Sequence, residues 1–523
     1  MASLALVLAA AGTQAQTAPE VPRLVVHILI DQLRTDYMEA FAPLYGDGGF
    51  RRLMQQGGYY ADAQPPFATP DRASGAACTS TGAVPYDNGI PSIAWLSRQT
   101  LRPVYCVDDD TQAGHNTDER TSAASLLTTT LSDELKIATG GQAIVYSIAP
   151  EREVAVLMAG HAADAAVWIN DQTGHWCGTA AYGAFPSWAA AFERAEPLAS
   201  RLRKLVWEPM YSGGLQEFHY FHSVANTAKL DFRHRFEGER RVRQFKASGM
   251  GNEEVQNLVD YCLKTSYIGR DQTPDVLAIG LYAGNYDHQN VVRYPSEMQD
   301  TYVRLDRVLE HIFKQTEHYV GAERVLFVVS STGYADHPAD DIDFAAMHIP
   351  TGSYSMARAT MLLNMYLSAV FGQAQWVEGT HGCQFYLNHK LIEQRQLQLA
   401  SVLERAEECL SQMAGVRDVY TSQRLALGQW SRGLDLVRAG WNINRSGDII
   451  VDVNPGWRIV GDDGSEHVDG GNPYIAYPLF FLGPLVEPRH TATPVSMAAI
   501  APTLARCLRI RAPNGCREAP LGL

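Results

Sequence analysis

The chain has 523 residues and a formal net charge of −14, with 46% hydrophobic and 19% charged residues. This composition is that of an ordinary globular protein, so disorder is excluded as the state of most of the chain, and the length allows a large α/β core with inserted excursions. The negative charge excludes a general nucleic-acid binder, because phosphate backbones are held mainly by lysine and arginine.

The N-terminal segment MASLALVLAAAGTQAQ is a short apolar run followed by small residues. This pattern is typical of a secretory signal peptide. We expect cleavage after Ala15, which makes residues 1–15 the signal peptide and 16–523 the mature protein; a buried N-terminal helix is the alternative. No later segment is long and apolar enough to span a membrane. The sequence therefore predicts an exported protein of the periplasm or cell envelope.

Nearly continuous apolar runs at residues 23–31 and after Ala143, Asp275 and Arg324 predict central parallel strands that are buried on both faces. Helical patterns separate them, so the expected fold is α/β: a doubly wound, mostly parallel sheet with helices on both faces. A last strand is expected after Pro478. Ligands bind such sheets outside the carboxyl ends of the strands, which makes Asp31 a candidate site residue.

Two excursions, at about 187–271 and 345–466, differ in composition from the strand and helix alternation around them. We expect both to form caps on the core. The second contains the helical pattern LASVLERAEECLSQMA and the strand-like DIIVDVNPGW, which together predict a small α+β lobe.

The eight cysteines are too widely spaced for a zinc finger or a redox motif. Cys507 and Cys516 flank a Pro-Asn-Gly turn and are the expected disulfide; two unpaired thiols are the alternative. The basic stretch 233–246 contains Glu237 and Glu239, and this charge pattern predicts a solvated helix face or loop.

Several segments in order carry a family resemblance: IDQLRTDYM, GGFRRLMQQGGYYADA, TGAVPYDNGI, VYCVDD, SDELKIATGG, AGHAADAAVW, DTYVRLDRVL, YLNHKLIEQ, SGDIIVDVNPGW and IAPTLA. In them the chain resembles the alkaline phosphatase superfamily, specifically periplasmic monoesterases related to nucleotide pyrophosphatases and type I phosphodiesterases. The resemblance implies an alkaline phosphatase-like sheet with inserted caps. It also implies two zinc ions roughly 4 Å apart, a threonine or serine nucleophile, and groups that bind phosphate oxygens.

At the positions that carry this chemistry, the chain holds other residue types. Asp31 matches the zinc ligand after the first strand, but Arg72 stands in the nucleophile's place. A guanidinium is not deprotonated in proteins, so it cannot attack phosphorus or ligate zinc. The other vestigial metal positions are Asn285, Gln289, Ser331, Thr332 and Ala476, where the family has aspartates and histidines.

Of the accessory phosphate-binding groups, Ile93 and Pro150 replace an asparagine and a lysine, and Arg152 alone persists. Asp287 and His288 lie next to the second ligand pair. They do not restore it, because adjacent residues point apart and neither has a partner four residues on. His161 and residues 108–110 also have ligand-type side chains, for which we expect packing or solvation instead.

We therefore interpret the chain as a pseudophosphatase without catalytic residues, zinc or other cofactor. It would act as an exported binding or scaffold protein with an unknown envelope partner. One alternative is an active zinc-dependent phosphomonoesterase or phosphodiesterase with a relocated nucleophile, Ser74 or Thr79. Another is a sensor that binds phosphate or a similar small anion between Arg72 and Arg152, since two arginines suit oxyanion recognition.

Two geometric expectations follow. The vestigial positions should cluster at the carboxyl ends of the strands, although they are scattered in the sequence. Arg72 should form an ion pair with Asp31, because a carboxylate at the end of a buried strand is costly when it is left unpaired.

Overall fold

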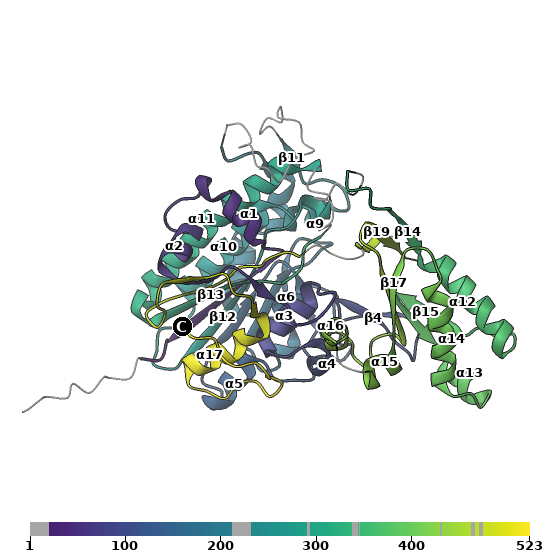
Figure 1. The fold of residues 1–523 in the computed structure, drawn as a ribbon. Helices are drawn as coiled ribbons and strands as arrows, with labels where there is room; N and C mark the ends of the chain where they lie inside the picture. The colour runs from purple at the N-terminus through teal and green to yellow at the C-terminus, as the bar shows by residue number, and fades with distance from the viewer. Residues whose placement is uncertain are drawn as a thin grey trace, which may run out of the picture.

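A sheet of ten strands runs through the molecule in the order β22-β2-β21-β13-β1-β12-β7-β8-β9-β6 (Figure 1). The computed structural model describes residues 20–211, 232–289, 293–336, 344, 346–428, 431–461, 466–469 and 474–523, so the expected signal peptide lies outside the described residues. The central strands β13 (Val325–Ser331), β1 (Leu24–Asp31), β12 (Asp275–Tyr282), β7 (Val145–Ile148) and β8 (Ala165–Ile169) are parallel. The expected doubly wound α/β fold is therefore confirmed.

Antiparallel pairing occurs toward both margins of this sheet. β21 (Leu479–Leu482) runs antiparallel to β13 and to β2 (Gly58–Tyr60), and β2 pairs in parallel with β22 (Arg489–Thr491). At the other margin, β9 (Trp176–Thr179) is antiparallel to β8 and to β6 (Gly114–His115). The strand expected after Pro478 is thus present as β21, and it runs antiparallel to both of its neighbours.

Helices cover both faces of the sheet because β1 is apolar on both sides. Leu24, Val26, Ile28 and Ile30 pack in one hydrophobic cluster with helices α10 (Gly249–Thr265), α11 (Pro295–Val320) and α2 (Phe50–Gln56). Val25 and Leu29 point to the opposite cluster, with α3 (Arg72–Thr81), α5 (Leu131–Ala138), α6 (Arg152–Ala159) and α17 (Ile500–Leu508). Side chains alternate along a strand, so His27 and Asp31 share the α3 side.

α3 is fixed closely against the carboxyl ends of β1 and β13. Its N-cap Asp71 accepts a hydrogen bond from the Ser74 amide at 2.8 Å, and the Ser74 hydroxyl completes a capping box. One turn into the helix, a Cβ on Gly75 would lie 2.0 Å from the Thr332 carbonyl oxygen. Only glycine allows the helix to approach that strand end, and this approach places Arg72 beside β1.

A second lobe has its own sheet and hydrophobic core (Figure 1). Strands β15 (Val377–His381), β16 (Gln384–Leu387), β18 (Ile449–Val453) and β17 (Val416–Thr421) form the sheet, in that order. α12 (Met356–Phe371) and α14 (Leu399–Ser411) pack in the same core. The expected α+β character of this region is present, whereas the exact cap boundaries, 187–271 and 345–466, stay a prediction.

The remaining α-helices and β-strands are short: α1 (Thr35–Ala40), β3 (Ala63–Gln64), α4 (Pro85–Asn88), β4 (Ala94–Leu96), β5 (Pro103–Tyr105), α7 (Ser187–Ala195), α8 (Leu198–Arg201), β10 (Val206–Trp207), β11 (His234–Arg235), α9 (Arg241–Lys246), β14 (Gly352–Ser355), α13 (His389–Gln394), α15 (Ser422–Leu427), α16 (Arg432–Gly440), β19 (Trp457–Val460), β20 (Glu466–Asp469) and β23 (Val495–Ser496). Within the described ranges, no helix has the length and hydrophobicity needed to cross a bilayer.

The disulfide expected between Cys507 and Cys516 is absent, since both are free thiols. The Cys516 Sγ is turned toward the end of α3, where it donates a hydrogen bond to the Thr81 carbonyl at 3.2 Å. The Pro-Asn-Gly turn lies between the two cysteines, which are therefore close in the sequence. The folded chain nevertheless does not direct their side chains toward one another.

Candidate functional site

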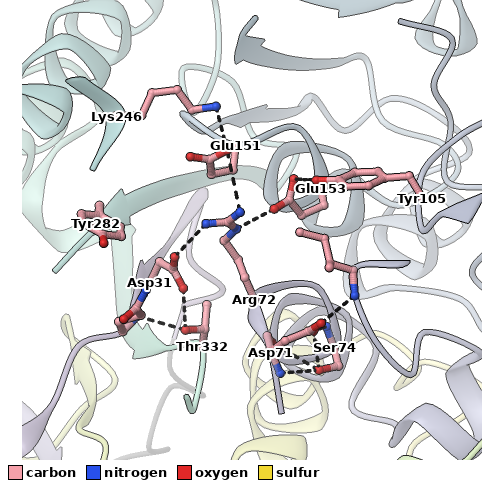
Figure 2. Close-up of polar contacts among 12 residues, drawn as sticks. Asp31, Asp71, Arg72, Ser74, Tyr105, Glu151, Glu153, Lys246, Tyr282 and Thr332 are labelled. Carbon is pink, nitrogen blue, oxygen red and sulfur yellow. Dashed lines mark hydrogen bonds and ion pairs between the residues drawn. The ribbon is translucent and has the colours of Figure 1, made fainter. Parts of the chain in front are cut away.

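Arg72 lies at the centre of a group of carboxylates at the strand ends (Figure 2). Its Nη1 is 3.3 Å from Asp31 Oδ2, its Nε is 2.5 Å from Glu153 Oε1, and its Nη2 is 3.9 Å from Glu151 Oε2. The Arg72 side chain is 14% exposed. The expected ion pair between Arg72 and Asp31 is therefore confirmed, although the shorter contact is with Glu153.

The buried carboxylates depend on these contacts to carry charge. Burial raises the pKa of Asp31 to about 6, while Arg72 opposes this rise. The Thr332 hydroxyl donates to Asp31 Oδ1 at 2.9 Å, which also favours the ionised form. For Glu153, burial by itself would raise the pKa, but Arg72 and the Tyr105 hydroxyl, which donates at 2.6 Å, lower it overall. Arg72 thus holds a position where a cation is required.

The charged network continues from Arg72 through Glu151 to Lys246 at the end of α9. Lys246 is 3% exposed, and its Nζ lies 2.7 Å from Glu151 and 2.5 Å from Asp171. These carboxylates follow β7 and β8, so Lys246 ties α9 to two strand ends. The prediction of a solvated segment for residues 233–246 is wrong at this residue, because alternating charges in the sequence do not show which basic side chain turns inward.

Several of the positions that the resemblance assigns to metal ligands meet around Asp31. β1 and β13 are in register, with Ile30 beside Ser331, and Thr332 follows directly. Asn285 lies three residues beyond Tyr282, the register partner of Asp31, and its carbonyl accepts a hydrogen bond from the Tyr282 hydroxyl at 2.6 Å.

The two other positions lie on surrounding loops. The Ala476 carbonyl accepts a hydrogen bond from the Thr35 amide at 3.0 Å, four residues after Asp31. Gln289 donates to the Asp287 carbonyl and accepts from Arg293, so its hydrogen bonds to described residues lie outside the cluster.

A second polar group covers Asp31, and the sequence reasoning missed it. The Gln32 side chain donates to Asp336 Oδ2 at 2.8 Å and accepts from the Asp336 amide at 2.8 Å. His288 Nδ1 is 2.6 Å from Asp336 Oδ2, and the Tyr334 hydroxyl donates to Asp31 at 3.4 Å. The polar residues directly after β13 were the one sign of this group in the sequence. Spacing alone could not show that they pair with Gln32, about 300 residues earlier.

The adjacent residues Asp287 and His288 diverge, as expected. Asp287 Oδ1 is 2.8 Å from Arg240 at the start of α9, whereas His288 turns toward Asp336. Burial lowers the pKa of His288, but the Asp336 carboxylate outweighs this effect and raises it overall. The two side chains therefore cannot bind one metal ion together.

Arg152 and the alternative nucleophiles are engaged elsewhere. Arg152 lies 2.9 Å from Asp108 and 4.3 Å from the centre of the Tyr105 ring. The Ser74 hydroxyl donates to Asp71 at 2.8 Å within the capping box, and the Thr79 hydroxyl donates to the Ala76 carbonyl at 3.0 Å. Both hydroxyl residues are buried, with 0% and 1% exposure. His161, the other sequence candidate, pairs with Asp133 at 2.9 Å.

The residues present do not fit a pair of zinc ions. A structural zinc site ordinarily has four protein donors, and a catalytic site has three. Among the positions that the resemblance assigns to metal ligands, only Asp31 is anionic, and its two oxygens already accept from Thr332 and Arg72. In the part of the chain that the structure describes, no group of three or more His, Cys, Asp or Glu side chains is arranged to hold a metal.

Comparison with known proteins places this site in a family context. The family model for type I phosphodiesterase / nucleotide pyrophosphatase matches residues 25–474. The chain is 26% identical to alkaline phosphatase PafA of Elizabethkingia meningoseptica, covering 98% of this chain and 96% of that protein. It is 26% identical to alkaline phosphatase PhoV of Synechococcus elongatus, covering 94% and 91%.

A protein of Myroides odoratus named calcium-transporting ATPase is 29% identical, with coverage of 96% and 94%. Among solved structures, the crystal structure of wild-type PafA superposes with a TM-score of 0.82 at 23% identity, covering 97% of this chain and 99% of that one. This superposition shows a shared fold. The chain belongs to the type I phosphodiesterase / nucleotide pyrophosphatase family, within the alkaline phosphatase superfamily.

Proposed function

We propose that this protein is a catalytically inactive member of its family, a pseudophosphatase that serves as an exported binding or scaffold protein of the cell envelope. The observation that carries the proposal is the position of Arg72. The residue holds the place that the resemblance gives to the nucleophile, and its guanidinium neutralises Asp31 and Glu153. An arginine in such contacts cannot act as a nucleophile.

The donor set supports the same conclusion. Amides, hydroxyls and a methyl group replace the expected carboxylates and imidazoles, and these are poor zinc ligands. Arg72 supplies positive charge to Asp31 directly, so the strand end carries its own neutralising cation.

The alternative of a relocated nucleophile has less support. Ser74 and Thr79 are buried in α3 and already donate their hydroxyl protons to Asp71 and Ala76. A serine or threonine hydroxyl needs a neighbouring base or a metal to become a nucleophile at neutral pH. The hydrogen bonds of these two residues stabilise α3.

The alternative of an anion sensor also has less support. Arg72 has carboxylates within 4 Å on three sides, and Arg152 is paired with Asp108. An added phosphate would have to displace these carboxylates or lie beside them, and like charges repel strongly in a poorly hydrated site. The surroundings of Arg72 favour a structural role.

The test measures zinc and turnover on the purified chain. After incubation with zinc and gel filtration, elemental analysis should find far less than one zinc per chain. Hydrolysis of p-nitrophenyl phosphate and bis-p-nitrophenyl phosphate should equal that of Arg72→Ala. Ser74→Ala and Thr79→Ala serve as matched variants for the relocated nucleophile.

Stoichiometric zinc together with turnover that Arg72→Ala abolishes would overturn the proposal. Turnover that only Ser74→Ala or Thr79→Ala abolishes would establish the active-enzyme alternative. Calorimetric binding of inorganic phosphate, lost in Arg72→Ala, would establish the sensor. Export and the partner are tested by fractionating cells and by capture from the native envelope with the tagged chain.

A further inference from the structure

Helix α12 of the second lobe has two apolar faces. Met356, Ala359, Leu363 and Leu367 are buried in the core of the lobe. On the opposite face, Met361 is 56% exposed and Met365 63%. Figure 1 places α12 at the outer margin of the lobe, away from the ten-stranded sheet. An amphipathic surface helix would carry polar residues there.

The exposed face has an internal symmetry. Ala357, Met361, Met365 and Ala369 follow each other at intervals of four residues and form one ridge on the helix surface. The order Ala, Met, Met, Ala reads the same in both directions. Arg358, near the N-terminal end, is the only charged residue among the 16 residues of α12.

We propose that this face binds α12 of a second copy of the same chain, antiparallel and around a two-fold axis between Met361 and Met365. An isologous contact needs a surface that is complementary to itself when reversed, and the ridge has this property. Met361 then faces Met365 of the other copy, and Ala357 faces Ala369.

Charge complementarity supports the antiparallel direction. In that arrangement, Arg358 of each copy lies toward the C-terminal end of the other copy's helix. The unpaired carbonyl groups at a helix C-terminus carry partial negative charge and favour a nearby cation. A parallel arrangement would instead bring the two Arg358 side chains together.

A membrane surface fits this face less well. Helices that lie on anionic bilayers carry several lysines or arginines beside the apolar face. α12 has one arginine, and the whole chain carries a net charge of −14. A self-contact places no like charges against each other, because the ridge itself is uncharged.

The size of the contact sets the expected strength. A single helix pair buries less than the roughly 1,200 Å² of a standard stable interface. The dimer is therefore weak, with a dissociation constant on the order of micromolar. Association should be visible as a concentration-dependent change in mass.

Sedimentation velocity across a concentration series tests the contact. The intact chain should pass from monomer to dimer, and Met365→Glu should remain monomeric at every concentration. Met347→Glu is the matched control, because Met347 is 62% exposed and lies outside α12. A chain that is monomeric throughout, or a dimer that both variants weaken equally, overturns the proposal.

Cross-linking tests the two-fold register. Met361→Cys and Met365→Cys chains are oxidised with copper phenanthroline, singly and as a mixture, beside the unchanged protein. The mixture should form more disulfide-linked dimer than either variant alone. Equal cross-linking in the single variants overturns the register, and capture of a different protein without self-association overturns the choice of occupant. Neither result bears on catalysis, so the proposed function is tested separately.

Discussion

His27 and Asp31 lie four residues apart on β1 and point to the same side of the sheet. Burial lowers the pKa of His27 to about 4 and raises that of Asp31 to about 6. In the unfolded chain, the ordinary order holds, with aspartate near 3.9 and histidine near 6.5. Folding therefore makes the acid weaker and the base weaker on the same strand.

The two residues should give opposite pH dependences of stability. Between about pH 4 and 6 the folded state keeps the Asp31 proton that the unfolded chain releases, so this residue makes stability fall as pH rises. His27 is neutral when folded and protonated when unfolded between about pH 4 and 6.5, so this residue makes stability rise with pH. Each effect amounts to at most about 1.4 kcal/mol per pH unit, and the two largely cancel.

Single substitutions should separate these effects. The stability of His27→Gln, which keeps only the Asp31 effect, should fall as pH rises from 4 to 6. The stability of Asp31→Asn, which keeps only the His27 effect, should rise from pH 4 to 6.5. Urea unfolding at a series of pH values measures both slopes, and His318→Gln on the exposed surface is the control. If the stability of both variants changed with pH in the same direction, the opposite pKa shifts of Asp31 and His27 would be contradicted.

Arg72 should be a large contributor to stability at neutral pH. Arg72→Met leaves Glu153 and Asp31 buried without their cation, and breaking a buried ion pair typically costs about 3–5 kcal/mol. Adding Glu153→Gln should recover part of that loss, because one uncompensated charge is removed. Chemical denaturation of the unchanged chain, the single variants and the double variant measures their free energies of unfolding.

Arg152→Met is the matched control for Arg72→Met, since the Asp108 side chain that Arg152 binds is 46% exposed and such a pair is worth about 1 kcal/mol or less. Equal losses in the two single variants would show that Arg72 is not structural.

At the scale of single elements, the position of α3 depends on the close approach at Gly75. In Gly75→Ala the new Cβ would meet the Thr332 carbonyl oxygen at 2.0 Å, and backbone atoms on a central strand end cannot move aside easily. We expect a loss of several kcal/mol, larger than the usual gain of up to about 1 kcal/mol from alanine in a helix. Thermal and urea unfolding would measure it.

Gly433→Ala provides the comparison for this helix prediction. Gly433 lies in α16, and a Cβ there meets nothing within 4 Å, so this variant should be neutral or slightly more stable. If Gly75→Ala were equally well tolerated, α3 would not be fixed by its contact with Thr332.

The strands were predictable because burial on both faces leaves a strong pattern in the sequence. The run at residues 23–31 and the runs leading to β12 and β13 all became central parallel strands. The directions of the marginal strands were not predictable, because a short apolar strand has the same kind of sequence whether it runs parallel or antiparallel to its neighbour. β21 is short and apolar like its neighbours, yet it runs antiparallel to β13.

The candidate site was predictable only in part. Family register placed Arg72, Ser331 and Thr332 near Asp31, and the Arg72 to Asp31 pair followed from the cost of a buried charge. Glu151 and Glu153 were missed as partners, although they flank Arg152 in the sequence. Which residue of a Glu-Arg-Glu run turns inward depends on how α6 is oriented, and local sequence does not specify that orientation.

At the scale of the whole molecule, the charged network joins parts of the chain that are far apart in sequence. Arg72 on α3, Glu151 after β7, Lys246 on α9 and Asp171 after β8 form one connected chain of contacts. The network lies at the end of the sheet where this fold binds its ligands. Burial of several charges there is stable only while each has its partner.

This mutual dependence affects how easily the chain could change in evolution. Replacing Arg72 by threonine would introduce a hydroxyl, and would leave Asp31 and Glu153 without their cation. Introducing a metal ligand first would place another acid or imidazole beside an arginine that already occupies the space. Under the proposed function, each single step of this kind would therefore give a less stable protein that gains no activity, and an inactive site would be hard to reverse by one mutation at a time.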